Sequence, residues 1–248
     1  MSSDLSSAEA HLWEVVENNQ EKIVDMSIVQ LSLFANVSTA TIVRTMKKMG
    51  YTGYTAYREN LRNSGNYNAK FKILNSVDST IKDVILKNEI ELNNTLNNLE
   101  TSTIEDSIAA TRQAKMVYIF ARGLSESIAR EMQTKLQLSG KYTEMFSDPN
   151  IIKIISKKIK RDCIVIFITL NGETPELVYA AKNLEKADVS KITFTTNRNS
   201  SIVPYSDLLF LGHKSATSYF PEYEISSRLP LNIMMRIFTD TYAVRTKK

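Results

Sequence analysis

The chain has 248 residues, of which 43% are hydrophobic and 23% charged, enough for one large domain or two small domains with separate cores. Its net charge is only +4, and its single cysteine excludes an intramolecular disulfide and a cysteine-rich zinc site. The first ten residues are polar, so we expect no signal peptide, and the longest apolar runs, such as residues 163–170, are too short to span a bilayer. We therefore expect a cytoplasmic protein.

Residues 1–73 are predicted to form an all-helical domain. Two capping boxes, Ser6 with Glu9 and Ser27 with Gln30, indicate where helices begin. Apolar residues follow at helical spacing after each of them.

Two short helices joined by a tight turn are predicted within residues 27–50, because Ser38 can cap the second helix and Gly50 can end it. This spacing suits a helix-turn-helix, whose second helix enters the major groove of DNA. A plain three-helix bundle without a DNA role has the same spacing. The side chains that the second helix can offer to bases or phosphates are Ser38, Thr39, Thr41, Arg44, Lys47 and Lys48.

The charge changes sign inside this helical domain. Residues 1–35 carry a net charge of −5 and residues 36–72 a net charge of +6. A basic face confined to one part of a domain is typical of nucleic-acid binding, although a solvated charged surface gives the same count.

The C-terminal part, residues 74–248, is predicted to be an α/β domain. A polar stretch over residues 64–76 indicates a linker, and helices follow over residues 77–99 and from Thr103. Strands are then predicted over residues 116–120, 142–146, 163–170, 191–195 and 208–211, and helices over residues 124–138, 151–159, 175–184 and 229–244. Strands separated by helices predict a parallel sheet within an α/β sandwich.

Two loops between a predicted strand and the next helix, residues 121–125 and 169–174, are rich in small and hydroxyl-bearing residues. Such a loop at a helix N-terminus presents backbone N–H groups and the positive end of the helix dipole to an anion such as phosphate. Ordinary turns and helix caps use the same residues. The candidate ligand-binding residues in these loops are Gly123, Ser125, Thr169, Asn171, Gly172, Glu173 and Thr174.

Other catalytic and metal-binding patterns are missing. There is no Walker A loop, no complete G-x-G-x-x-G and no G-x-S-x-G. His11 and His213 have no partners at metal-ligand spacing, and Cys163 is expected to be an inert core thiol. Glu173 and Glu224 are the only candidates for a general base. We expect no metal, no cofactor and no enzymatic activity.

The N-terminal sequence resembles a known family. Residues 37–44 (VSTATIVR) and 48–54 (KMGYTGY) are similar to the "VS-x-ATVVR" and "KLG(F/Y)-x-G(F/Y)" stretches of RpiR-type (MurR/RpiR) regulators. The resemblance covers about residues 5–65 and implies that the second helix contacts DNA through Ser38, Thr39, Thr41 and Arg44, with Lys47 and Lys48 in support.

Residues 77–245 resemble the SIS (sugar isomerase) domain. The segments ARGLS (121–125), TLNGET (169–174), TTN (195–197), SDLL (206–209) and EISSR (224–228) follow its motifs in order. This resemblance adds Asn197 to the candidate ligand-binding residues. Ala121, Thr169 and Asn171 depart from the family's glycine and two serines, differences that can change which phosphate ligand binds and how tightly.

Together the two resemblances imply a bacterial regulator, more often a repressor, of genes for sugar or amino-sugar uptake and catabolism. It would bind a palindromic operator in double-stranded DNA as a homodimer or homotetramer and respond to a phosphorylated sugar or amino sugar. Two alternatives stay open: the SIS domain serves only oligomerisation, or the protein is a sugar-phosphate isomerase.

Overall fold

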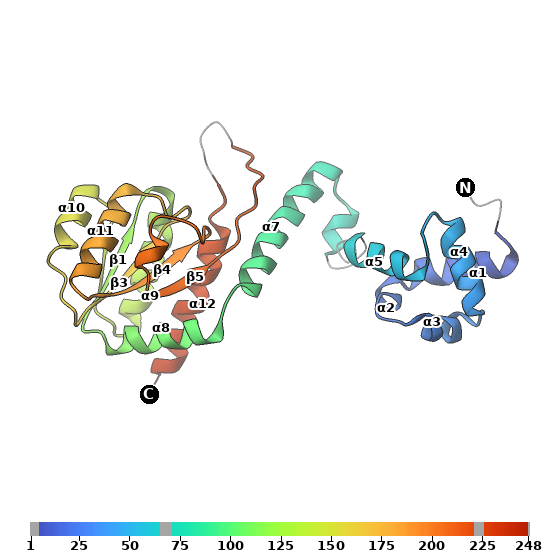
Figure 1. Cartoon of the computed structure of the whole chain (residues 1–248), viewed down its shortest axis with the longest axis horizontal. Helices are drawn as coiled ribbons and strands as arrows, with labels where there is room; N and C mark the ends of the chain where they lie inside the picture. Colours follow the sequence, from blue (N-terminus) through green and yellow to red (C-terminus); the bar gives the residue numbers. More distant parts are fainter. Residues whose placement is uncertain (1–4, 65–70, 221–225, 248) are drawn as a thin grey trace. The chain divides into compact units, whose positions relative to one another are not determined.

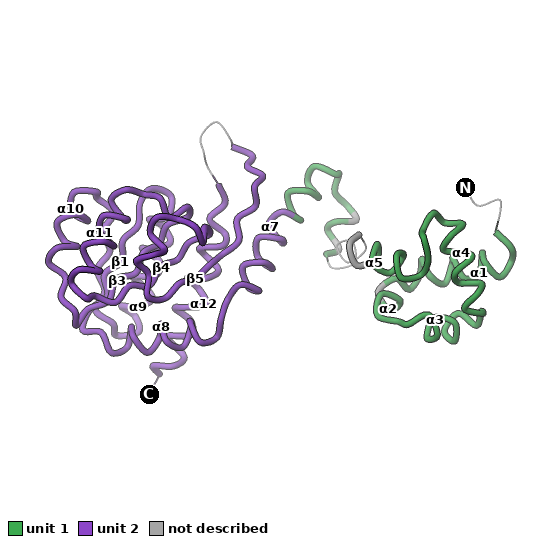
Figure 2. Tube along the Cα trace, viewed as in Figure 1, with its two compact units in different colours: residues 1–86 green, residues 87–248 purple. Residues whose placement is uncertain are grey.

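The computed structural model describes residues 5–64, 71–220 and 226–247, and the chain divides into two compact units, residues 1–86 and 87–248. Figure 2 shows the two units in different colours, with the change falling within helix α7 (Ser79–Asn97). Each unit has a hydrophobic core of its own. None of the helices in the described ranges combines the length and the apolar composition that crossing a membrane requires.

The first unit is helical, as predicted. Its elements before α7 are α1 (Ser7–Asn18), α2 (Gln20–Ile23), α3 (Ile28–Ala35), α4 (Thr39–Lys48), α5 (Tyr54–Ser64) and the short 3-10 helix η1 (Lys72–Asn75). Both predicted capping boxes are present: the N–H of Ser6 donates to Glu9, and the N–H of Ser27 donates to Gln30. Residues 65–70 of the predicted linker lie outside the described residues.

The core of the first unit is formed by one apolar side of each main helix. Its buried members are Leu12, Val16, Ile23, Leu31, Ala35, Ile42, Met46, Tyr54, Tyr57 and Leu61. The hydroxyl of Tyr54 donates to the carbonyls of Ile23 and Met26, which ties α5 to the chain before α3. This packing holds the pair α3 and α4 in place while leaving one side of α4 uncovered.

The second unit is an α/β sandwich around a parallel sheet, which confirms the predicted class. Its strands are β1 (Val117–Ala121), β2 (Thr143–Phe146), β3 (Ile164–Ile168), β4 (Ser190–Thr195) and β5 (Leu208–Leu211), in the order β2-β1-β3-β4-β5. The helices that follow α7 are α8 (Thr101–Gln113), η2 (Gly123–Ser125), α9 (Glu126–Leu138), α10 (Pro149–Ile155), α11 (Pro175–Lys186), η3 (Val203–Tyr205) and α12 (Leu229–Thr246).

Helices cover both faces of the sheet, as Figure 1 shows. Ile164, Ile166 and Ile168 of β3 pack with α8, α9 and α12, whereas Val165 and Phe167 pack with α10 and α11. Alternate side chains of a strand point to opposite faces, so every residue of β3 is buried. The apolar run at residues 163–170 therefore marks the centre of the sheet.

Helix α10 differs from its prediction over residues 151–159. It begins at Pro149, because the carboxylate of Asp148 accepts hydrogen bonds from the N–H groups of Asn150 and Ile151. It ends at Ile155, and Ile159 is buried in the core beside the sheet instead of continuing the helix. Apolar spacing alone does not distinguish a helix from a turn that returns an apolar side chain to the core.

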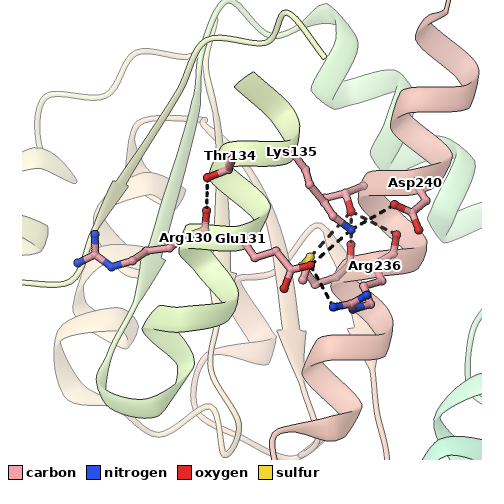
Figure 3. Close-up of polar contacts among 8 residues, drawn as sticks. Arg130, Glu131, Thr134, Lys135, Arg236 and Asp240 are labelled. Atoms are coloured by element: carbon pink, nitrogen blue, oxygen red, sulfur yellow. Dashed lines mark hydrogen bonds and ion pairs between the residues drawn. The ribbon is translucent and has the colours of Figure 1, made fainter. Parts of the chain in front are cut away.

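Charged side chains link α9 and α12 on the surface of the second unit, as Figure 3 shows. Glu131 Oε1 lies 3.3 Å from Arg236 Nη2, and Lys135 Nζ lies 3.2 Å from Asp240 Oδ1. The same Glu131 and Lys135 approach each other at 3.5 Å along α9. These contacts lie over a buried apolar contact between the two helices.

Candidate functional site

The turn between α3 and α4 is fixed by its own polar groups. Asn36 adopts a left-handed conformation with φ of 50°, which asparagine tolerates better than most residues. Ser32 then donates a hydrogen bond from Oγ to the carbonyl of Val37. Ser38 caps α4, because its Oγ accepts from the N–H of Thr41 at 3.1 Å. The helix therefore begins at a defined point with its first turn presented outward.

The six residues predicted to contact DNA do not all lie on the same surface. Ser38, Thr39, Arg44, Lys47 and Lys48 are exposed, whereas Thr41 is only 8% exposed. The Thr41 hydroxyl lies 2.9 Å from Ser38 Oγ and takes part in the cap. Within the described parts of the chain, Arg44 and Lys47 form neither hydrogen bonds nor ion pairs through their side chains.

Lys48 forms an ion pair with Glu9 of α1. Its Nζ donates to Glu9 Oε2 at 2.9 Å, and the Glu9 side chain is 5% exposed. The hydrogen bonds from Lys48 and from the N–H of Ser6 lower the pKa of Glu9 from 4.5 to about 2. Glu9 and Lys48 therefore join α1 to the end of α4, and Arg44 and Lys47 are the freer cations on the helix.

In the second unit, the candidate loops leave the carboxyl ends of neighbouring strands. Ala121, the last residue of β1, pairs with Ile168, the last residue of β3. From β1 the chain continues to β2 on one side of the sheet, and from β3 it continues to β4 on the other. The loops after β1 and β3 therefore diverge at the point where open α/β sheets bind ligands.

The loop after β3 has the geometry of an anion cradle. Gly172 has φ of +71°, and a Cβ at this position would lie 2.1 Å from Ser200 Oγ, so only glycine fits. The Oγ1 of Thr169 accepts from the N–H of Gly172 at 3.3 Å and closes the loop. The N–H groups of Asn171, Glu173 and Thr174 donate no hydrogen bond within the described ranges, and α11 follows directly at Pro175. Free N–H groups at a helix N-terminus favour an anion.

A lysine outside the predicted motifs lies at this loop. Lys214 donates from Nζ to Asn171 Oδ1 at 2.9 Å, and Asn197 donates from Nδ2 to the carbonyl of Asn171 at 3.3 Å. The segments after β3, β4 and β5 therefore meet around Asn171. The available signal was the position of Lys214, three residues beyond a predicted strand whose carboxyl end shares the edge.

Glu173 points to a serine of the segment after β4. Its two carboxylate oxygens accept from the N–H of Ser201 at 2.9 Å and from Ser201 Oγ at 2.5 Å. These two hydrogen bonds lower the pKa of Glu173 below its ordinary value. The carboxylate therefore stays ionised and secures the loop to the neighbouring segment.

The loop after β1 is arranged differently. Gly123 has φ of +56°, and its N–H donates to Glu126 Oε1 at 3.0 Å, so this donor is already used. Ser125 is 2% exposed and precedes α9. The structure thus places Thr169, Asn171, Gly172, Glu173, Thr174 and Asn197 in one connected group, with Gly123 and Ser125 in the adjacent loop.

The remaining candidates add no second centre. No group of three or more His, Cys, Asp or Glu residues gathers as a metal site in the parts of the chain that the structure describes. The backbone N–H of His213 donates to Thr95, and Cys163 is partly buried with its thiol pKa raised by burial. Glu224, a candidate general base, lies outside the described residues.

Comparison with known families matches both units. Residues 1–68 match the family described as "Helix-turn-helix domain, rpiR family", and residues 111–235 match the SIS domain.

Two relatives and one solved structure illustrate the similarity. The HTH-type transcriptional regulator GlvR of Bacillus subtilis is 23% identical over 80% of this chain and 74% of its own length. The HTH-type transcriptional regulator HexR of Escherichia coli is 25% identical over 77% of this chain and 68% of its own length. The structure of the Vibrio vulnificus NanR protein complexed with ManNAc-6P shares the fold, with a TM-score of 0.61 and 17% identity over 98% of this chain and 88% of that chain.

Proposed function

Because the chain belongs to the RpiR-type family of transcriptional regulators and carries both a helix-turn-helix and an SIS domain, we propose that it binds operator DNA through α4 and a phosphorylated sugar through the loop after β3. The ligand controls transcription by changing the affinity for the operator. The family resemblance favours repression in the absence of the inducing ligand.

The exposed side of α4 supports the DNA-binding proposal. Thr39 lies in its first turn, and Arg44 and Lys47 follow with no ionic partner in the described parts of the chain. Arginine and lysine in these positions can contact guanine edges and phosphates, while Ser38 and Thr41 orient the N-terminus of the helix. Lys48 supports the interface mainly by anchoring α4 to Glu9.

The observation that carries the ligand proposal is the set of three free N–H groups before α11. They lie in a loop that the hydrogen bond between Thr169 and Gly172 closes, and the Lys214 ammonium group is bound to Asn171 of the same loop. Backbone dipoles and a side-chain cation can therefore act on one bound anion. NanR, which shares this fold, was solved with ManNAc-6P, a phosphorylated amino sugar. We therefore propose a hexose or hexosamine phosphate as the ligand class.

The state of Glu173 favours a regulator over an isomerase. A general base works best when its pKa lies near the operating pH, whereas the pKa of Glu173 is lowered and both of its oxygens are bound by Ser201. A coupled assay with aldose and ketose phosphates tests this point. Turnover on the order of 1 s⁻¹ or faster would contradict it.

A two-fold symmetric protein matches a palindromic operator, so we propose that the active form is a homodimer or homotetramer. Light scattering of the full-length protein, with and without operator DNA, measures this directly. A monomer bound to a single half-site would overturn it.

A gel shift with the DNA upstream of the protein's own gene, at two salt concentrations, tests the DNA part. Arg44→Ala and Lys47→Ala should each weaken the complex and reduce its salt dependence, by about one unit of slope for each phosphate that is no longer neutralised. Lys22→Ala, which removes an exposed lysine from α2, is the matched control and should leave binding unchanged. Equal binding by all three variants would contradict the proposed interface.

Calorimetry with a panel of hexose and hexosamine 6-phosphates tests the ligand part. One member should bind, and Lys214→Ala should weaken that binding by about tenfold or more, since the variant removes the cation that contacts Asn171 at this loop. Lys153→Ala, at an exposed position of α10, serves as the control. If the DNA is bound but no sugar phosphate is, the SIS domain serves oligomerisation alone.

A further inference from the structure

A cavity lies at the amino end of the sheet, away from the loops that follow β1 and β3. Its volume is about 1040 Å³, just above the usual range of small-molecule sites. It is lined by residues at the starts of β1, β2 and β3, among them Tyr118, Thr143 and Cys163, and by Gln137 of α9. The proposed sugar-phosphate loop is at the carboxyl end of the same strands, so the two places are separate.

Four lysines line this cavity: Lys115, Lys141, Lys158 and Lys160. They come from three different segments, before β1, before β2 and after α10. None of the four forms an ion pair with a carboxylate in the described parts of the chain, although Glu144 and Asp162 also line the cavity. Unpaired like charges around one cavity repel one another, and a bound anion relieves that repulsion.

Lys141 is the buried member of this group, with 9% of its surface exposed. Its ammonium group donates to the carbonyls of Arg112 and Ala114 at the end of α8, which leaves one of its three hydrogens available. Burial lowers its pKa, because the charged form loses hydration. An anion in the cavity restores part of that lost stabilisation.

We propose that this cavity binds a small polyanion carrying two or more phosphate or carboxylate groups, as a second anion site of the protein. Three of the four lysines, Lys115, Lys158 and Lys160, are exposed and come from two segments that line the cavity. Several cations at one cavity favour a ligand with more than one anionic group over a single anion. Tyr118 and Gln137 line the same space and supply neutral polar contacts.

Calorimetry on the full-length protein tests the proposal, with pyrophosphate and citrate as polyanionic probes and sulfate as the single-group comparison. Pyrophosphate or citrate should bind with a Kd below about 1 mM and at least about tenfold more tightly than sulfate. Binding of pyrophosphate alone identifies a phosphate ligand, and binding of citrate alone identifies a carboxylate ligand. No binding of either probe, or sulfate binding equally well, would overturn the proposal.

Charge-reversal variants locate the binding. Lys158→Glu with Lys160→Glu changes two exposed cavity lysines and should weaken the polyanion by about tenfold or more. Lys153→Glu with Lys186→Glu makes the same change in net charge at exposed positions that do not line the cavity, and should have less than about a threefold effect. Equal losses in both double variants would show nonspecific attraction and reject the site.

A third variant separates this inference from the proposed function. Gly172→Ala alters the loop at the opposite end of the sheet, so polyanion binding should be unchanged even where sugar-phosphate binding is lost. Loss of polyanion binding in Gly172→Ala would place the polyanion in the loop after β3 and refute a second site.

Discussion

At the scale of single residues, the carboxylate of Glu9 links folding of the first unit to pH. Its pKa is about 2 in the folded chain, against an ordinary value of 4.5. A group whose folded pKa is lowered stabilises the protein above its unfolded pKa, and this stabilisation is lost as the pH falls through the folded value. The relevant window therefore extends from about pH 4.5 down to about pH 2.

We expect Glu9→Gln to lower the melting temperature of the first unit at pH 7, with a difference from the parent protein that shrinks as the pH falls through this window. Fluorescence of Trp13, the only tryptophan of the chain, measures that unit separately because the ring packs against its core. Glu14→Gln, at an exposed position of α1, is the control and should show no such pH dependence. A difference for Glu9→Gln that stayed constant down to pH 2 would contradict the assigned role.

A second residue-scale prediction concerns Gly172. An alanine there would combine a left-handed backbone, which costs roughly 1 kcal/mol, with a Cβ placed 2.1 Å from Ser200 Oγ. Gly172→Ala should therefore displace the loop and reduce sugar-phosphate affinity by about tenfold or more, while DNA binding by the first unit persists.

The matched control is Gly140→Ala, where φ is +78° and nothing lies within 4 Å of the added Cβ. It carries the backbone strain without the collision and lies away from the loop after β3, so its sugar-phosphate affinity should match that of the parent protein. Calorimetry on both variants separates strain from steric displacement. Equal affinity in all three proteins would mean that the loop after β3 does not hold the ligand.

At the scale of elements, α9 and α12 are joined by both charged and apolar contacts, and their contributions should differ. The charged pairs in Figure 3 are partly or largely exposed, so Glu131→Gln should lower the free energy of unfolding by less than about 1 kcal/mol. Phe238 is fully buried and packs edge-on against Phe194 and Phe210. Phe238→Ala should lower that free energy by about 3–5 kcal/mol.

Urea unfolding followed by circular dichroism measures both variants of this pair. A loss for Glu131→Gln as large as that for Phe238→Ala would contradict the expectation that buried apolar packing stabilises α12 more than the surface charges do. Because Glu131 contacts both Lys135 and Arg236, a double variant with Arg236→Gln isolates the contribution of the pair between α9 and α12.

The class and order of these elements could be predicted from the sequence because each strand and helix is encoded locally. The apolar run around β3 and the capping residues Ser6 and Ser27 need no distant partner to be recognised. Contacts made across the fold were not accessible in this way. Lys214 meets Asn171 from 43 positions away. Its place after a predicted strand indicated the edge of the sheet but not the side chain that it contacts.

Thr41 shows a limit of a different kind, since the sequence did contain the signal. It stands three residues after the N-cap Ser38, the same spacing as Ser6 to Glu9 and Ser27 to Gln30. A side chain at that position tends to fold back onto the cap, and Thr41 does so. Helical spacing alone gave it the same outward role as Thr39.

At the scale of the whole molecule, the two proposed binding activities must be coupled in both directions. If a sugar phosphate changes operator affinity by some factor, operator DNA must change sugar-phosphate affinity by the same factor, which is typically about 5–150-fold. Calorimetric titration of the ligand with and without the operator duplex measures one side, and gel shifts with and without the ligand measure the other. Equal ligand affinity in both titrations would rule out an effector role.

The separation between strands and loops in the second unit bears on how such a protein can diversify. The side chains of β1 and β3 lie mostly in the two apolar clusters that cover the faces of the sheet. The candidate ligand contacts lie on segments beyond the strand ends. Substitutions at Asn171, Asn197 or Lys214 can therefore change which ligand is recognised without disturbing the cores. Gene duplication followed by a few changes at this edge would let a descendant protein bind a different ligand while the apolar clusters that determine its fold stayed unchanged.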